Sequence, residues 1–87
     1  MAINLGEDSM DDKNYIRKEA EILYNYIIYD EEKFDNKKQV YARIYNSIKG
    51  SVSCQIGGME FLEISIDEVK AIIKDVVDRN VKKIEYK

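Results

Sequence analysis

Apolar side chains between residues 12 and 29 recur at intervals of four, three and four residues, which places them on one face of an α-helix. That face consists of Ile16, Ala20, Leu23 and Ile27. Ser9 or Asp11 can cap the first turn. From Ile22 onward, isoleucines and tyrosines spread around most of the circumference, as is typical of a helix that lies centrally in a fold or in an interface. We therefore predict a helix over 12–29 and a charged connection over 30–36.

A second helix is predicted over residues 37–49. Val40, Ile44 and Ile48 recur every four residues, which is the spacing of one helical face. Asp35 can cap the start of this helix. Gly50 can end it in the left-handed conformation, which glycine adopts without strain.

After residue 50, the spacing of the apolar residues changes from helical to alternating. Residues 51–56 alternate between polar and apolar side chains, and residues 59–64 form a second apolar segment. The two glycines between them, at positions 57 and 58, are a two-residue hairpin signal. With the turn at these glycines, Cys54 and Phe61 face each other on an inner apolar side. This pattern predicts a β-hairpin.

The end of the chain predicts one more helix and one more strand. Ser65 and Glu68 have the spacing of a capping box, which starts a helix over 66–79. Asn80 can end that helix, and residues 81–86 then form a final strand.

The predicted order of elements is α-α-β-β-α-β, which indicates one small α+β domain over residues 1–87. A right-handed crossover lays the last strand parallel to the second strand, and a place beside the first strand then makes all neighbours antiparallel. We therefore expect a three-stranded antiparallel sheet of order 2-1-3 with helices packed mainly on one face. The domain divides into a polar lead-in (1–10), an acidic and then a basic helix (11–50), and a ββαβ unit (51–87).

The composition excludes most catalytic chemistry. The 87 residues include no histidine and a single cysteine, Cys54, so the chain has no imidazole base, no internal disulfide and no zinc cluster. In an apolar strand that cysteine would be an inert core thiol. The acidic residues Asp30, Glu31, Glu32 and Asp35 lack the alternating oxygen ligands and the central glycine of a calcium loop. We therefore expect no enzyme activity, no metal and no cofactor.

The net charge of −3 hides a strong segregation along the chain. The net charge is −6 over residues 1–36, +4 over 37–50 and −1 over 51–87. The basic segment contains no acidic residue.

Three interpretations of this segregation stay open. The acidic and basic segments can neutralise each other within the fold. The basic helix can instead contact nucleic acid, with Tyr41 or Tyr45 stacking on bases. In the third interpretation, the two segments form a protein-binding surface, where opposite charges steer association.

The seven tyrosines also have two interpretations. Tyrosine is frequent in interfaces because it combines a rigid contact area with a polar tip, and it also suits the half-buried edge of a helix in a small protein. Tyr24 and Ile28 lie one helical turn apart and outside the first apolar stripe. We therefore predict them as the self-association residues of a homodimer.

Small size, segregated charge and missing catalytic chemistry favour a protein-binding module that inhibits or regulates a larger protein or complex. The predicted partner-binding residues are Lys37, Lys38, Tyr41, Arg43, Tyr45, Asp30, Glu31 and Glu32. The alternative is a nucleic-acid-binding regulator that uses the basic helix 37–49. The overall acidic balance counts against this alternative, because phosphates repel it at long range.

The sequence also predicts a cytoplasmic protein without a membrane partner. Its longest unbroken apolar stretch, 26–29, is too short to cross a bilayer, and its first ten residues lack the features of a signal peptide. A lone cysteine suits a reducing compartment. In composition, the chain is similar to small acidic proteins of phages and mobile elements, anti-CRISPR inhibitors among them, which implies an inhibitory role.

Overall fold

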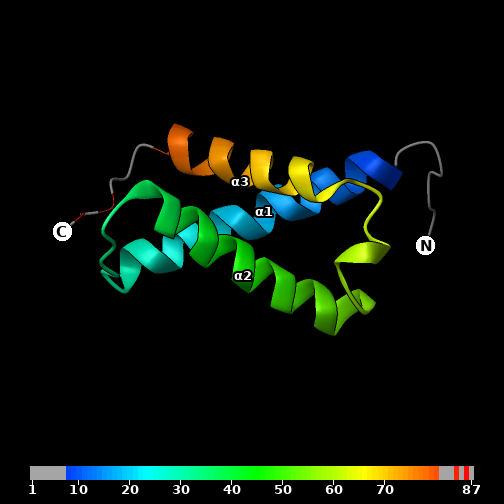
Figure 1. The fold of residues 1–87 in the computed structure, drawn as a ribbon, viewed down its shortest axis with the longest axis horizontal. Helices are drawn as coiled ribbons and strands as arrows, with labels where there is room; N and C mark the ends of the chain where they lie inside the picture. Colours follow the sequence, from blue (N-terminus) through cyan, green and yellow to red (C-terminus); the bar gives the residue numbers. More distant parts are fainter. Residues whose placement is uncertain (1–7, 81–83, 85, 87) are drawn as a thin grey trace.

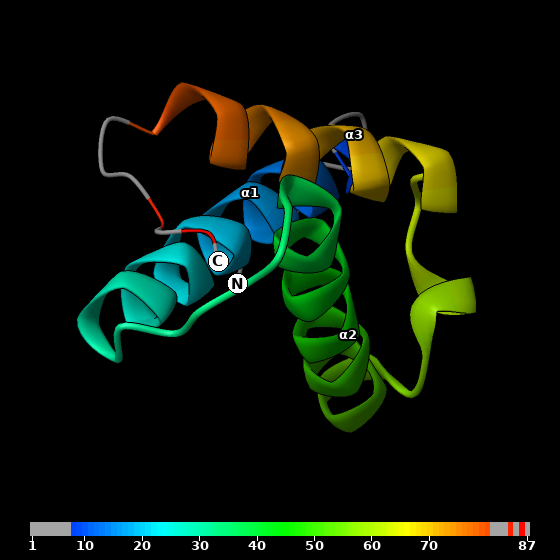
Figure 2. The same ribbon diagram turned by 60° about the vertical axis from the view of Figure 1, so that its left-hand side comes forward.

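The computed structural model describes residues 8–80, 84 and 86, and this part of the chain is built from three α-helices (Figure 1). The helices are α1 (Asp8–Tyr29), α2 (Lys37–Ile56) and α3 (Ile66–Arg79). A 3-10 turn, η2 (Met59–Phe61), connects α2 to α3. Figure 2 shows α2 crossing beside α1, while α3 lies over both.

Contacts between side chains define the directions of the helices. Lys13 Nζ lies 3.3 Å from Glu68 Oε2, so the starts of α1 and α3 are close together. The Tyr15 hydroxyl donates to Gln55 Oε1 at 3.1 Å, which brings the start of α1 to the end of α2. Accordingly, α1 and α3 run in the same direction, and α2 runs opposite to both.

The helix predicted over 12–29 is confirmed, and α1 begins four residues earlier at Asp8. Ile16, Ala20 and Ile27 are buried as the spacing predicts. Leu23 is half-buried, while Tyr24 is only 2% exposed and belongs to the core. The buried face of α1 is therefore rotated slightly toward Tyr24.

α1 ends in a Schellman motif. The Glu31 N–H donates to the Ile28 carbonyl and the Glu32 N–H donates to the Ile27 carbonyl, both at 3.1 Å. Glu31 takes the left-handed conformation, with a φ of 56°, at the position where glycine is usual. The Asp30 N–H still donates to the Tyr26 carbonyl at 2.8 Å, so the helical turn continues through Asp30.

The second predicted helix is confirmed, but its predicted end at Gly50 is wrong, because α2 continues to Ile56. Val52 extends the four-residue spacing of the helix 37–49, and all four residues of the stripe are 0% exposed. Burying a valine contributes about 1.5–3 kcal/mol, while a glycine inside a helix costs about 1 kcal/mol. The apolar stripe therefore outweighs the glycine. It consists of Val40, Ile44, Ile48 and Val52.

The predicted β-hairpin over 51–64 is wrong, since its two glycines follow a helix. Gly57 has a φ of 99° and caps α2 by donating its N–H to the Ser53 carbonyl at 3.2 Å. Cys54, expected on an inner strand face, is exposed on α2, and Phe61 is 63% exposed in η2. Met59 is buried in their place.

The predicted α+β fold with a sheet of order 2-1-3 is wrong: the part of the chain that the structure describes forms a three-helix bundle and contains no strand. Most of the strand predicted over 81–86 falls outside the described residues. Of its described members, Ile84 is buried, and Tyr86 makes an isolated parallel bridge with Phe34. A single bridge is too short to build a sheet.

The N-caps of α2 and α3 both use local side chains. Ser65 Oγ accepts from the Glu68 N–H at 3.1 Å, which confirms the predicted start of α3. For α2, the cap is Asn36 rather than the predicted Asp35, because Asn36 Oδ1 accepts from the Gln39 N–H at 3.2 Å. Asp35 contributes indirectly by accepting from the Gln39 side chain at 3.3 Å.

Substitutions of two glycines test the continuous α2 helix. Gly50→Ala should raise the free energy of unfolding by about 0.5–1 kcal/mol, because alanine favours the helix more strongly and nothing lies within 4 Å of a Cβ there. Gly57→Ala should lower it by about 1 kcal/mol or more, because a Cβ at φ +99° is strained and meets the Phe61 ring at 3.3 Å. Urea titrations measure both. Destabilisation by Gly50→Ala would contradict a helix that passes through this residue.

Candidate functional site

A groove of about 420 Å³ lies between α2 and α3. The lining residues on each helix are three or four positions apart, so each helix contributes one continuous face. Because α2 and α3 are antiparallel, the first half of α2 lies beside the middle and the second half of α3. The lining residues are Lys38, Tyr41, Ala42 and Tyr45 of α2, with Lys70, Ile73 and Lys74 of α3.

The groove has an apolar floor edged by ammonium groups. Ile73 is 1% exposed and belongs to the core, while Ala42 is exposed, so together they continue the core surface outward. The rings of the two tyrosines are half-buried. Three lysine side chains complete the lining. This combination suits a ligand that is apolar in the middle and negatively charged at its edges.

The three lysines of the groove differ in their partners. Lys74 Nζ lies 3.4 Å from Asp78 Oδ2, one helical turn away. Lys70 Nζ lies 5.5 Å from the centre of the Tyr45 ring, within cation–π distance. Neither Lys38 nor Lys70 has a carboxylate partner among residues 8–80, 84 and 86. The groove therefore carries positive charge that the described part of the fold does not neutralise.

Asp78 ties the two helices together at one end of the groove. The Tyr41 hydroxyl donates to Asp78 Oδ1 at 2.8 Å, and Lys37 Nζ lies 3.1 Å from the same oxygen. Two hydrogen bonds lower the pKa of Asp78: the bond from Tyr41 has the larger effect, and the bond from Lys37 has the next largest. Burial and the hydrogen bond to Asp78 raise the pKa of Tyr41 to about 12. Tyr41 is therefore a neutral donor whose ring is held at the groove.

Arg43 was predicted to bind a partner, and the structure shows it in an internal ion pair outside the groove. Its Nε and Nη2 atoms each donate to one oxygen of Glu32, both at 3.1 Å. Arg43 also donates to Ser47. This bidentate pair joins the acidic turn after α1 to α2. Internal neutralisation, the first interpretation of the charge segregation, therefore holds for Arg43 and Glu32.

The remaining predicted site residues lie in different surroundings. Lys37 pairs with Asp78, while Asp30 and Glu31 are exposed in the turn that ends α1. Tyr24, predicted for self-association, is in the core, and Ile28 is half-buried on α1. Of the predicted partner-binding residues, the groove brings together Lys38, Tyr41 and Tyr45.

The lysines on the α3 side of the groove were not among the predicted site residues. Lys70 and Lys74 lie four residues apart on the polar side of the helix predicted over 66–79, which is a usable signal. The signal was hidden because residues 51–87 carry nearly balanced charge overall. Only the antiparallel packing of α3 against α2 places these lysines beside Lys38.

Among residues 8–80, 84 and 86, no group of three or more acidic or cysteine side chains could hold a metal ion. No helix in these ranges is both long and apolar enough to cross a membrane. Comparison of the chain with protein-family models, curated proteins and solved structures gives no match.

The raised pKa of Tyr41 should make stability depend on pH in the alkaline range. A phenol with a pKa of 10.0 in the unfolded chain and about 12 in the native state stabilises the fold fully below pH 10. That contribution is lost as the pH rises from 10 to 12. Tyr41→Phe should therefore lose less free energy of unfolding over this range than the wild type, as measured by urea titrations at a series of pH values. Equal losses in the two proteins would contradict the assignment.

Proposed function

We propose that this protein is a small protein-binding module that holds an acidic, partly apolar segment of another protein in the α2–α3 groove. By occupying that segment, it would inhibit or regulate the partner. The observation that carries the proposal is the apolar floor of the groove beneath three lysine side chains. No catalytic step is included in the proposal.

The charge of the groove favours an acidic ligand. Lys38 and Lys70 lack a carboxylate partner among the described residues, so carboxylates of a ligand would supply the missing negative charge. Opposite charges across an interface raise the rate of association and exclude partners of the wrong sign. The positive charge that the fold leaves unbalanced would thus select the ligand.

The apolar floor and the tyrosines favour a protein segment over a simple anion. Ala42 and Ile73 offer apolar surface, and tyrosine is enriched among the residues that contribute most to protein interfaces. The α2 side of the groove, from Lys38 to Tyr45, is about 10 Å long at the rise of an α-helix. This length suits a few extended residues or about two turns of a helix.

The nucleic-acid alternative has less support from the side-chain contacts. Arg43 and Lys37, two of the basic residues it would use, already pair with Glu32 and Asp78. Phosphate binding would compete with these internal pairs. The net charge of −3 would also repel a polyanion at long range. Binding of nucleic acid in the groove would therefore contradict the proposal.

A cytoplasmic location fits the proposal. Cys54 is a free, exposed thiol on α2, and a reducing compartment keeps such a thiol reduced.

Selection from a library of random dodecapeptides displayed on phage tests the proposed ligand class. The wild-type protein should enrich peptides that combine aspartate or glutamate with aliphatic or aromatic residues. Lys38→Glu combined with Lys70→Glu should weaken binding of an enriched, fluorescently labelled peptide by about tenfold, because the variant repels carboxylates. Fluorescence anisotropy measures this affinity.

Lys18→Glu combined with Lys49→Glu is the matched control, because it makes the same change of charge at two exposed lysines that do not line the groove. It should leave peptide affinity within about twofold of the wild type. Enrichment of basic peptides, or equal affinity of the groove variant, would contradict the proposal. Salt-sensitive binding of labelled duplex DNA or single-stranded RNA, lost in the groove variant, would move the assignment to nucleic acid.

A further inference from the structure

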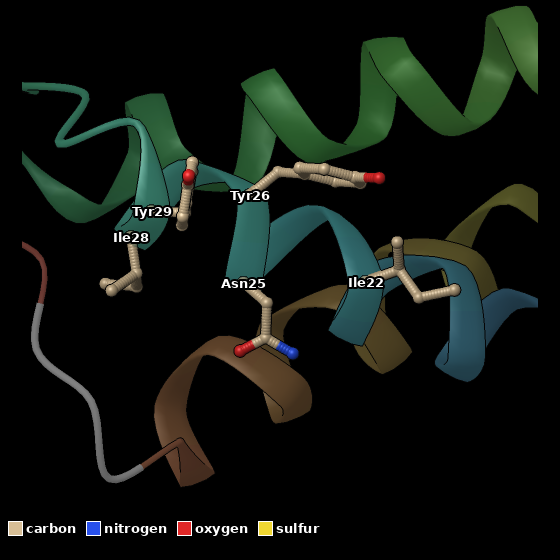
Figure 3. Close-up of a pocket in the computed structure, with 5 residues that line it drawn as sticks. All are labelled: Ile22, Asn25, Tyr26, Ile28 and Tyr29. Carbon is tan, nitrogen blue, oxygen red and sulfur yellow. The ribbon is translucent and has the colours of Figure 1, made fainter.

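α1 carries a second apolar surface, separate from the groove. A hollow of about 500 Å³ lies along its last two turns and is lined by Ile22, Asn25, Tyr26, Ile28 and Tyr29. Ile22 is 40% exposed, Tyr26 57% and Tyr29 84%. In Figure 3, the Tyr26 ring extends from its own turn toward the turn that carries Ile22. These side chains form an apolar face that the described part of the bundle leaves open.

The exposed residues belong to one ridge of the helix. Lys18, Ile22, Tyr26 and Asp30 follow one another at four-residue intervals, which is the spacing of a helical ridge. The hydrogen bond from the Asp30 N–H to the Tyr26 carbonyl, at 2.8 Å, keeps Asp30 in line with the helix. The ridge therefore has two apolar side chains in the middle, a positive charge at one end and a negative charge at the other.

The two charges at the ends of this ridge are available. Lys18 and Asp30 are exposed, and neither side chain has a hydrogen-bond or ion-pair partner among residues 8–80, 84 and 86. The other two basic residues of α1 are already paired: Arg17 Nη1 lies 2.9 Å from Asp75 Oδ2, and Lys13 Nζ lies 3.3 Å from Glu68 Oε2. The described part of the fold therefore leaves an unpaired charge of opposite sign at each end of the ridge.

This ridge is complementary to itself in the antiparallel direction. If two copies are related by a two-fold axis that crosses α1 midway between Ile22 and Tyr26, Lys18 of one copy faces the partner's Asp30. In the same register, Ile22 faces the partner's Tyr26, and each contact occurs twice, as an isologous interface requires. In the commonest class of helix packing, ridges of this four-residue spacing on the two helices interdigitate.

We propose that α1 is the interface of a homodimer, in which the ridge Lys18–Ile22–Tyr26–Asp30 packs antiparallel against the same ridge of a second copy. One short ridge buries little surface compared with a stable standard interface, so the dimer is weak and depends on concentration. The proposal does not depend on the proposed function, because the groove belongs to α2 and α3.

Sedimentation velocity over a concentration series from micromolar to millimolar tests the dimer, and charge exchange tests its register. Wild-type protein should shift from monomer to dimer as the concentration rises. Lys18→Glu and Asp30→Lys should each raise the dimer dissociation constant about tenfold, because each variant brings like charges together in two places. A mixture of these two variants should recover association to within about threefold of the wild type, because unlike charges meet again in the heterodimer.

Far-UV circular dichroism of each variant checks that the helices are intact, and both substitutions are at exposed positions. A wild type that stays monomeric at every concentration would overturn the proposal, as would a dimer that neither variant weakens. Failure of the mixed variants to recover would overturn the antiparallel register. Binding of the groove-selected peptide to the same variants should be unchanged, so failure of the dimer and failure of the groove are distinguishable.

Discussion

The buried stripe of α2 is the feature on which the rest of the structure depends. Val40, Ile44, Ile48 and Val52 are 0% exposed, and α2 packs against both α1 and α3. Each such side chain contributes about 1.5–3 kcal/mol by burial, compared with at most about 1 kcal/mol for an exposed ion pair. Because the stripe extends from Val40 to Val52, α2 must remain helical past Gly50, and the chain can turn back toward α3 only after Ile56.

The apolar core positions the helices, and the ion pairs then divide the surface charges into two groups. One group connects elements, as Arg43 does with Glu32 and Lys37 does with Asp78. The other group, including Lys38 and Lys70, has no carboxylate partner among the described residues. The segregation of charge along the sequence is therefore partly explained by the fold, since two of the four basic residues of segment 37–50 pair with acidic residues of their own chain. The proposed function uses only the charges that the described fold leaves over.

Local signals made α1, α3 and the first part of α2 predictable, and non-local packing decided where α2 ends. The capping box at Ser65 and the stripe of α1 lie within a few residues of the turns they define. Residues 51–56 fit two patterns, because Val52 belongs both to an alternating strand and to the stripe that begins at Val40. Two consecutive glycines suit a hairpin turn as well as a helix end. Burial of Val52 in the core favours the helix over the strand. The place of the α3 lysines beside α2 follows from the packing of these two helices, which the sequence pattern does not contain.

α1 and α3 differ in how many of their apolar residues lie outside the core. On α3 the apolar stripe is buried except for Ile66, so packing in the bundle accounts for the sequence of that helix. On α1 the core accounts for Ile16, Ala20 and Ile27 but leaves Tyr26 and Tyr29 exposed. A helix that is apolar on nearly every side is expected either at the centre of a fold or in an interface. The bundle covers only part of α1, and the proposed dimer would cover its open face. Since no groove residue comes from α1, a dimer formed there would keep both grooves open, and two linked acidic segments could bind it with greater avidity than one.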